Sequence, residues 1–139
     1  PLRSERCVVK VAATEEEKKI RRWRKIALEA GRQSGRSVLP EVAASLESVG
    51  AFCRRQEGCD LKLIFWEEET TQRLQDVRPA AEPRSIACLI GPEGGFTRAE
   101  VETARERGFQ SLSLGPRILK AETAPVAMLA LLQHLWGDM

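Results

Sequence analysis

Two glycine-rich bends, each placed directly after a short apolar run, constrain this chain more than any other feature of it. The first spans Leu89–Phe96 and the second spans Leu114–Ala124. Short apolar runs of this kind are typical of buried strands. Glycine lets the backbone approach a ligand closely after such a strand, because it has no Cβ and tolerates positive φ. Two bends that follow neighbouring strands therefore predict one small-molecule site built largely from main-chain groups.

Apolar periodicity predicts strands and helices in alternation along the chain. The expected strands are residues 6–11, 61–66, 85–90 and 109–114. The expected helices are residues 15–33, 45–55, 97–107 and 121–136. This alternation predicts an α/β fold with a mostly parallel sheet flanked by helices.

Local signals mark several of these helices. Thr97 and Glu100 have the spacing of a capping box, and Gly108 is placed to end the helix that they open. The helix at residues 15–33 has an apolar stripe made of Ile20, Trp23, Ala27 and Ala30. The last helix has a stripe that is too rich for a terminal surface helix, made of Val126, Leu129, Leu132, Leu135 and Trp136. We therefore expect part of the last helix to meet a second copy of the chain.

Basic residues are concentrated in one stretch. From Lys18 to Arg36 there are eight lysines and arginines against the single acid Glu29, a net +7, while the rest of the chain sums to −5. Clusters of this kind are typical of surfaces that contact phosphates. The stretch predicts a surface that faces a polyanion, with an ordinary solvated helix face as the alternative.

Composition and cysteine spacing exclude several classes of protein. With 139 residues, 42% of them hydrophobic and 30% charged, the chain is typical of one soluble globular domain. It has no apolar run near the roughly 20 residues that span a membrane. Its cysteines form no Cys-x-x-Cys pair and have only His134 as a histidine partner, which argues against a zinc site. We expect no metal, a cytoplasmic location and reduced, mostly structural thiols at Cys7, Cys53, Cys59 and Cys88.

The two bends, taken in this order, resemble the C-terminal half of the SPOUT (α/β-knot) methyltransferases. Within them, the chain is most similar to the RsmE family of 16S rRNA uridine-N3 methyltransferases. Ser4–Cys7, the helix and turn from Trp23 to Arg36, and Glu122-Thr123-Ala124 share that resemblance. The resemblance implies a trefoil-knotted sheet, a homodimer packed partly through the last helix, and the small ribosomal subunit as partner.

The resemblance also implies that the knotted loops bind S-adenosylmethionine in a bent form, with no metal. The glycines would let main-chain groups reach the cofactor, and the apolar residues would form its walls; simple core packing is the alternative role for each apolar residue. The cofactor-binding residues implied are Leu89, Ile90, Gly91, Pro92, Glu93, Gly94, Gly95, Leu114, Gly115, Arg117, Ile118, Leu119, Thr123 and Ala124.

Methylation of uracil N3 requires that a proton leave this nitrogen, so a base or a cation that stabilises the imide anion is useful. Arg117 is the expected cation, and Glu122 is expected to orient Arg117 or to accept the proton. Glu122 could equally be an ordinary carboxylate at a helix N-terminus. The expected RNA-binding residues are Arg6, Arg21, Arg22, Arg32 and Arg36.

The chain begins at Pro1, and we expect residues 1–139 to form one SPOUT methyltransferase domain. The family's N-terminal PUA-like β-barrel, which binds RNA, and the first strand and helix of its catalytic domain are expected to be absent from this sequence. Two alternative functions stay open. One is a SPOUT ribose 2′-O-methyltransferase, although its Asn-x-Gly-type early motif is missing here, and the other is a non-catalytic RNA-binding or dimerisation fragment.

Overall fold

The computed structural model describes residues 2–6 and 13–137, which form two compact units. Of these residues, the first unit contains 2–3 and 13–48, and the second contains 4–6 and 49–137. The strand expected at residues 6–11 lies outside the described residues except for Arg6, which is in a turn.

The first unit is built on one long helix. Helix α1 (Ala13–Gln33) confirms the helix expected from residue 15 to residue 33. Its first turn is acidic and its last turn is basic, which suits the helix dipole. Ile20 is buried, whereas Trp23 is 39% exposed, so the expected stripe is only partly covered.

The chain after α1 returns along the helix toward its first turns. Nε of Arg24 donates to the carbonyl oxygen of Val42 at 3.3 Å, and the backbone N–H of Leu46 donates to Glu16 Oε1 at 2.7 Å. Arg3 also pairs with Glu16, at 3.0 Å. These bonds bring strand β2 (Glu47–Ser48) into parallel pairing with strand β1 (Leu2–Arg3).

The second unit is built on a parallel three-stranded sheet, which confirms the predicted α/β class with a parallel sheet. The strands are β3 (Leu61–Phe65), β4 (Ile86–Ile90) and β5 (Gln110–Leu112), in the order β4-β3-β5. Register pairs Phe65 with both Ile90 and Leu112. All three strands therefore end at the same edge of the sheet.

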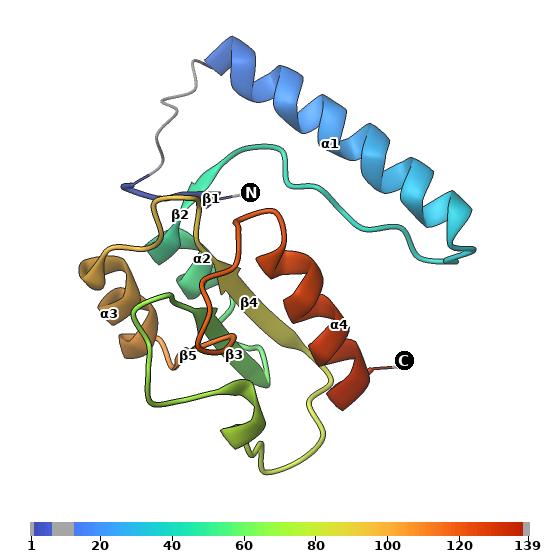
Figure 1. Cartoon of the computed structure of the whole chain (residues 1–139). Coiled ribbons are helices and arrows are strands. Elements are labelled where there is room, and N and C mark those ends of the chain that lie inside the picture. Colours follow the sequence, from blue (N-terminus) through green and yellow to red (C-terminus); the bar gives the residue numbers. More distant parts are fainter. Residues whose placement is uncertain (1, 7–12, 138–139) are drawn as a thin grey trace. The chain divides into compact units, whose positions relative to one another are not determined.

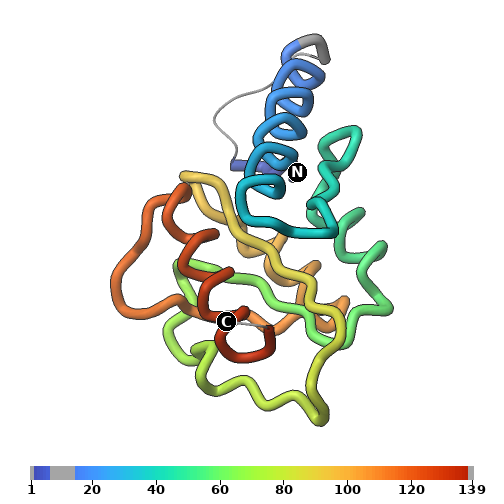
Figure 2. The backbone as a smooth tube through the Cα atoms, turned by 90° about the vertical axis from the view of Figure 1, so that its right-hand side faces the viewer, coloured from blue at the N-terminus to red at the C-terminus, as the bar shows by residue number. Residues whose placement is uncertain are grey.

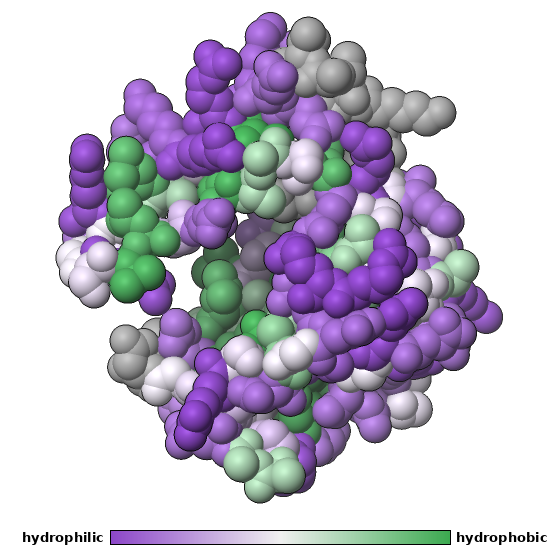
Figure 3. All heavy atoms as spheres, turned by 180° about the vertical axis from the view of Figure 1, so that it is seen from behind, coloured by the Kyte–Doolittle hydropathy of each residue, from purple (hydrophilic) through white to green (hydrophobic). Residues whose placement is uncertain are grey.

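Helices cover both faces of this sheet (Figures 1 and 2). Helix α4 (Ala124–Trp136) lies on one face, while α2 (Val49–Arg55) and α3 (Arg98–Glu106) pack together on the other side of the strands. The core under α4 contains alternate strand residues together with Met128 and Leu132 of the helix. The outer surface on the side of α2 and α3 is mostly hydrophilic (Figure 3). A short 3-10 helix, η1 (Leu74–Asp76), lies between β3 and β4 in the sequence.

Several expected boundaries differ from the structure. Residues 45–48 are not helical, because Glu47 and Ser48 pair with β1 instead, so α2 begins only at Val49. The last helix begins at Ala124 rather than at residue 121. The strand expected at residues 109–114 is reduced to β5, because Ser113 bonds to a neighbouring loop rather than continuing the ladder.

Candidate functional site

A pocket of about 900 Å³ lies where β3, β4 and β5 end. Residues 65–67, 69–70, 73, 90–95, 113–122 and 124 line it. Ligands of open α/β folds bind at the carboxyl ends of the parallel strands, because the loops that follow neighbouring strands meet there. The structure thus brings both glycine-rich bends into one site, as the sequence predicted.

The first bend is a tight turn between β4 and α3. The N–H of Gly95 donates to the carbonyl oxygen of Pro92 at 2.8 Å, and Gly95 has a φ of 69°. A Cβ on Gly95 would overlap the carboxylate of Glu67, and one on Gly94 would lie 2.7 Å from the carbonyl oxygen of Arg6. Glycine is therefore required here both by conformation and by the close approach of neighbouring groups.

The buried carboxylate of Glu100 joins this bend to the N-terminal segment. Thr97 and Glu100 form the predicted capping box, in which Glu100 Oε2 accepts from the N–H of Thr97 at 2.9 Å. The same carboxylate accepts from the hydroxyl of Ser4 and from the N–H of Glu5, both at 3.0 Å. Arg6, which follows, donates to the carbonyl oxygen of Gly94 at 3.4 Å. A helix cap thereby places Arg6 beside the first bend.

The second bend is stabilised by its own serine. The Oγ of Ser113 accepts from the N–H of Gly115 at 3.1 Å and donates to the carbonyl oxygen of Gly115 at 3.0 Å. Gly115 has a φ of 124° and open space around it, so conformation alone calls for glycine at this position. The bend continues through mostly exposed residues to the first turn of α4, where the N–H of Ala124 donates to the carbonyl oxygen of Lys120.

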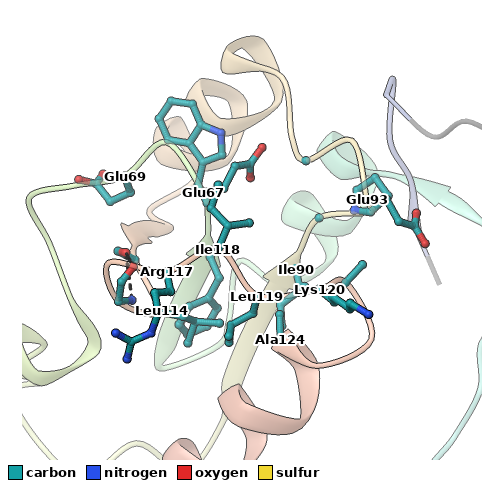
Figure 4. Close-up of a pocket in the computed structure, with 18 of the residues that line it drawn as sticks. Glu67, Glu69, Ile90, Glu93, Leu114, Arg117, Ile118, Leu119, Lys120 and Ala124 are labelled. Atoms are coloured by element: carbon teal, nitrogen blue, oxygen red, sulfur yellow. Dashed lines mark hydrogen bonds between the residues drawn. The ribbon is translucent and has the colours of Figure 1, made fainter.

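The pocket combines an apolar centre with charged margins. Ile90, Leu114, Leu119 and Ala124 lie together, and Figure 4 shows Arg117 and Glu93 on opposite sides of this group. Such a mixture is typical of small-molecule sites, in which a few polar groups orient a ligand against apolar walls.

The two expected catalytic residues, Arg117 and Glu122, both line the pocket and are both exposed. Within the described residues, no ion pair joins them, so no contact supports the expected role of Glu122 in orienting Arg117. Lys120 and Arg73 add positive charge to the same lining. The pocket wall therefore offers cations for an anionic group and a carboxylate for a proton.

Glu69 is a pocket residue that sequence reasoning missed. Its side chain is 8% exposed and pairs with Arg105 at 3.1 Å. The hydroxyl of Thr71 donates to Glu69 Oε1 at 2.6 Å, and this bond is the main reason that the pKa of Glu69 is lowered to about 2, against the opposing effect of burial. The run Glu67-Glu68-Glu69 directly after a strand was the available signal, but it does not show which carboxylate turns inward.

Some expected site residues lie outside the pocket lining. Leu89 has no exposed surface, because alternation along β4 turns it away from the face on which Ile90 lies. Thr123 is not among the lining residues either, although Ala124 is. Four expected RNA-binding residues are exposed side chains of the first unit, namely Arg21, Arg22, Arg32 and Arg36.

Within the described residues, neither a cysteine nor the histidine lines the pocket. Cys53, Cys59 and Cys88 are free thiols, and burial raises the pKa of Cys88 to about 12. Cys7 lies outside the described residues, and His134 is exposed on α4. Over residues 2–6 and 13–137, no three His, Cys, Asp or Glu side chains gather as metal ligands. In the same part of the chain, no helix combines the length and apolarity of a membrane span.

Known proteins resemble this chain over nearly its whole length. A family described as RNA methyltransferase domain matches residues 1–133. Ribosomal RNA small subunit methyltransferase E of Bacillus subtilis is 35% identical over 96% of this chain and 54% of its own length. The Synechocystis protein of the same name is 36% identical over 97% of this chain and 44% of its own length.

A solved structure also resembles this chain in its fold. Ribosomal RNA small subunit methyltransferase E from Neisseria gonorrhoeae, bound to S-adenosyl methionine, matches with a TM-score of 0.83 and 38% identity, over 100% of this chain and 55% of that one. The chain spans about half the length of the curated relatives it matches. From the family match over residues 1–133, we conclude that the chain belongs to the RNA methyltransferase domain family, as its resemblance to RsmE predicted.

Proposed function

We propose that this chain takes part in methylating N3 of a specific uridine in 16S rRNA of the small ribosomal subunit, with S-adenosylmethionine as methyl donor. The observation that carries the proposal is the pocket at the carboxyl edge of the sheet, built from the bends at residues 91–95 and 113–122. A relative that aligns with the whole of this chain was solved with S-adenosyl methionine bound, which supports the same cofactor here.

The residues present fit such a cofactor. A volume of about 900 Å³ lies within the range of roughly 300–1,000 Å³ that small-molecule sites occupy. Any Cβ at Gly95 would overlap Glu67, so the bend that lines the pocket depends on glycine there. We propose that the binding residues are Ile90, Gly91, Pro92, Glu93, Gly94, Gly95, Leu114, Gly115, Arg117, Ile118, Leu119 and Ala124.

When bound, the cofactor supplies a methyl group on a positively charged sulfur. The protein's task is to hold uracil N3 in line with that methyl group and to exclude water, for which Ile90, Leu114 and Leu119 provide apolar walls. We propose that Arg117 stabilises the negative charge that develops on the uracil ring as its N3 proton leaves. Glu122 is the proposed acceptor of that proton.

We propose that the basic helix α1 contacts the phosphates of rRNA. Arg21, Arg22, Arg32 and Arg36 are exposed and form no ion pair within the described residues, so their charge is available to a polyanion. In contrast, Lys18 and Lys25 are each paired with a glutamate of the same helix. Arg6, beside the first bend in the second unit, is a further proposed RNA contact.

We also propose that the protein is a homodimer. Helix α4 keeps Met128 and Leu132 in the core, but Val126, Leu129 and Leu135 are 68%, 55% and 45% exposed. Several large apolar side chains left exposed on one helix are typical of an interface. Leu129→Glu should produce monomers in light scattering while leaving the core residues of α4 in place, and an unchanged mass would refute this interface.

Two expectations about the architecture remain proposals. One is that the chain through both bends forms the trefoil knot of the SPOUT fold, for which the family membership is the support. The other is that residues 1–139 correspond to a methyltransferase domain within longer proteins such as the relatives above. An experimental structure of the protein would test both.

Two measurements separate this function from its alternatives. Titration calorimetry with S-adenosylmethionine tests the pocket, and absence of binding would favour a non-catalytic RNA-binding or dimerisation fragment. Incubation of the protein with the cofactor and unmodified small-subunit particles, followed by mass spectrometry of digested rRNA, identifies the methylated atom. A methyl group on N3 of uridine supports the proposal, whereas one on a ribose 2′ oxygen would favour the other SPOUT activity.

A further inference from the structure

A carboxylate buried at the edge of the pocket organises the loop after β3. Glu69 Oε1 accepts from the N–H of Thr71 at 2.9 Å and from that of Gln72 at 3.4 Å, in addition to the hydroxyl of Thr71. Three donors on one oxygen tie the chain into a compact turn over residues 69–72. Because backbone N–H groups supply two of these donors, the carboxylate determines the path of the loop as well as the position of one side chain.

The other carboxylate oxygen connects this turn to the body of the second unit. Glu69 Oε2 accepts from Arg105 of α3 at 3.1 Å, and the Arg105 guanidinium lies 5.9 Å from the centre of the Trp66 ring. Trp66 and Glu69 both line the pocket, and Figure 4 shows Glu69 on the same side of it as Arg117. The turn is therefore anchored on a helix rather than held by its own bonds alone.

The turn reaches the second glycine bend through one main-chain bond. The N–H of Ser113 donates to the carbonyl oxygen of Gln72 at 2.8 Å, and Ser113 also forms a parallel bridge with Arg73. The hydroxyl of Ser113 in turn donates to the carbonyl oxygen of Gly115 and accepts from its N–H. The connection runs in an unbroken series from Glu69 through Gln72 and Ser113 to Gly115.

Gly115 needs such support more than any other residue of the bend. Its φ of 124° is a conformation that residues with a side chain rarely adopt, and nothing lies within 4 Å of where its Cβ would be. On that open side no packing holds it, and its main-chain N–H and carbonyl oxygen both bond to Ser113. Displacement of Ser113 would therefore displace the bend and the pocket wall that follows it.

We propose that Glu69 is a positioning residue for the cofactor site, acting through the turn at residues 69–72 and Ser113 to hold the Gly115 bend in its binding conformation. This inference deepens the proposed function, on which it rests for the identity of the ligand. Glu69 itself need not touch the cofactor. Its role is to keep one wall of the pocket in place before the cofactor arrives, which lowers the cost of ordering that wall on binding.

Hydrogen exchange and a double-mutant cycle test the proposal in the full chain. In Glu69→Ala, we expect the Gly115 amide to exchange at least about tenfold faster, with the Ile64 amide of β3 reporting any global loss of stability. The dissociation constant for S-adenosylmethionine should rise about tenfold in Glu69→Ala and in Ser113→Ala. Because both act through the same bend, the double variant should be no more than about twofold weaker than Ser113→Ala.

Two further variants separate positioning from a general structural role. Glu102→Ala removes the exposed carboxylate on the other side of Arg105, at 3.8 Å, and should leave both measurements unchanged. Glu69→Gln keeps an acceptor oxygen for Thr71 and Gln72 and should restore slow exchange at Gly115. It also keeps the test available if Glu69→Ala fails to fold.

Three outcomes would overturn the inference: Gly115 exchange unchanged in Glu69→Ala, acceleration equal to that at Ile64, or effects of Glu69→Ala and Ser113→Ala that simply add. Failure of the unaltered chain to bind S-adenosylmethionine would instead count against the proposed function. In that case the exchange rates at Gly115, which need no ligand, still decide whether Glu69 holds the bend.

Discussion

Replacement of Gly95 by alanine should damage the pocket through two separable effects. The backbone at Gly95 is left-handed, with a φ of 69°, and this conformation costs an L-residue about 1–2 kcal/mol. The new Cβ would also overlap the carboxylate of Glu67, which would have to leave its present position. Because Glu67 is an exposed, flexible side chain, its displacement costs at most what an off-rotamer torsion does, up to about 1.5 kcal/mol. Together the two effects predict a loss of about 1–3.5 kcal/mol in the free energy of unfolding.

A double-mutant cycle separates the two effects. In a Glu67→Ala background no carboxylate opposes the new methyl group, so Gly95→Ala should cost only the backbone term of about 1–2 kcal/mol. Urea denaturation of the four proteins provides these free energies, and titration with S-adenosylmethionine measures the consequence for the pocket. We expect weakened binding in both backgrounds, because Gly95 lines the pocket.

A matched control is available in the same chain. Gly58 has no positive φ and open space around its position, so Gly58→Ala should change the free energy of unfolding by no more than about 0.5–1 kcal/mol. If Gly95→Ala cost the same in both backgrounds, the contact between Glu67 and Gly95 would have no energetic role. If it cost no more than Gly58→Ala, the requirement for glycine in this bend would be refuted.

Three other predictions follow from charge and burial. Reversal of Arg21, Arg22 and Arg24 to glutamate should weaken RNA binding and reduce its salt dependence, by a slope of about 0.7–0.9 for each phosphate that the protein no longer neutralises. An unchanged slope in filter binding would show that α1 is an ordinary solvated helix face. Because folding lowers the pKa of Glu69 to about 2, its contribution to stability is present above the ordinary carboxyl pKa and is lost as pH falls toward 2. The difference in urea midpoint between the parent and Glu69→Gln should therefore shrink from pH 6 to pH 3, because pH 3 lies between the ordinary carboxyl pKa and the lowered value of about 2, and a constant difference would contradict it. Cys88, whose pKa burial raises to about 12, should resist thiol labelling at pH 8 in the native protein and react once urea is added, as mass spectrometry can measure.

Local sequence signals determined the elements of the second unit and much of its site. The apolar runs of β3 and β4, the capping box at Thr97 and Glu100 and the stop at Gly108 each depend on neighbours within a few residues. The two glycine bends also lie close to their strands, so their meeting at one edge followed from the parallel sheet alone. Such features can be predicted because the forces that create them act over short stretches of chain.

Where the sequence prediction was wrong, a distant partner had overridden a local preference. Residues 45–48 have a helical pattern, yet Glu47 and Ser48 form a strand because β1 offers its backbone groups to them. The role expected for Leu89 in cofactor binding stays a prediction, since only its side chain is turned by the pleat of β4 into the core on the opposite side from Ile90.

Tertiary structure alone decided which charged residues organise the pocket. Glu100 holds Ser4 and Glu5, more than ninety positions away in the sequence, and Glu69 meets Arg105 across 36 positions. Neither pairing has a periodic signature, because a carboxylate can accept from any donor that the fold brings within reach. The sequence thus determined that a pocket lined by two glycine bends would form, whereas the packing of α3 against the loop after β3 decided which side chains hold those bends in place.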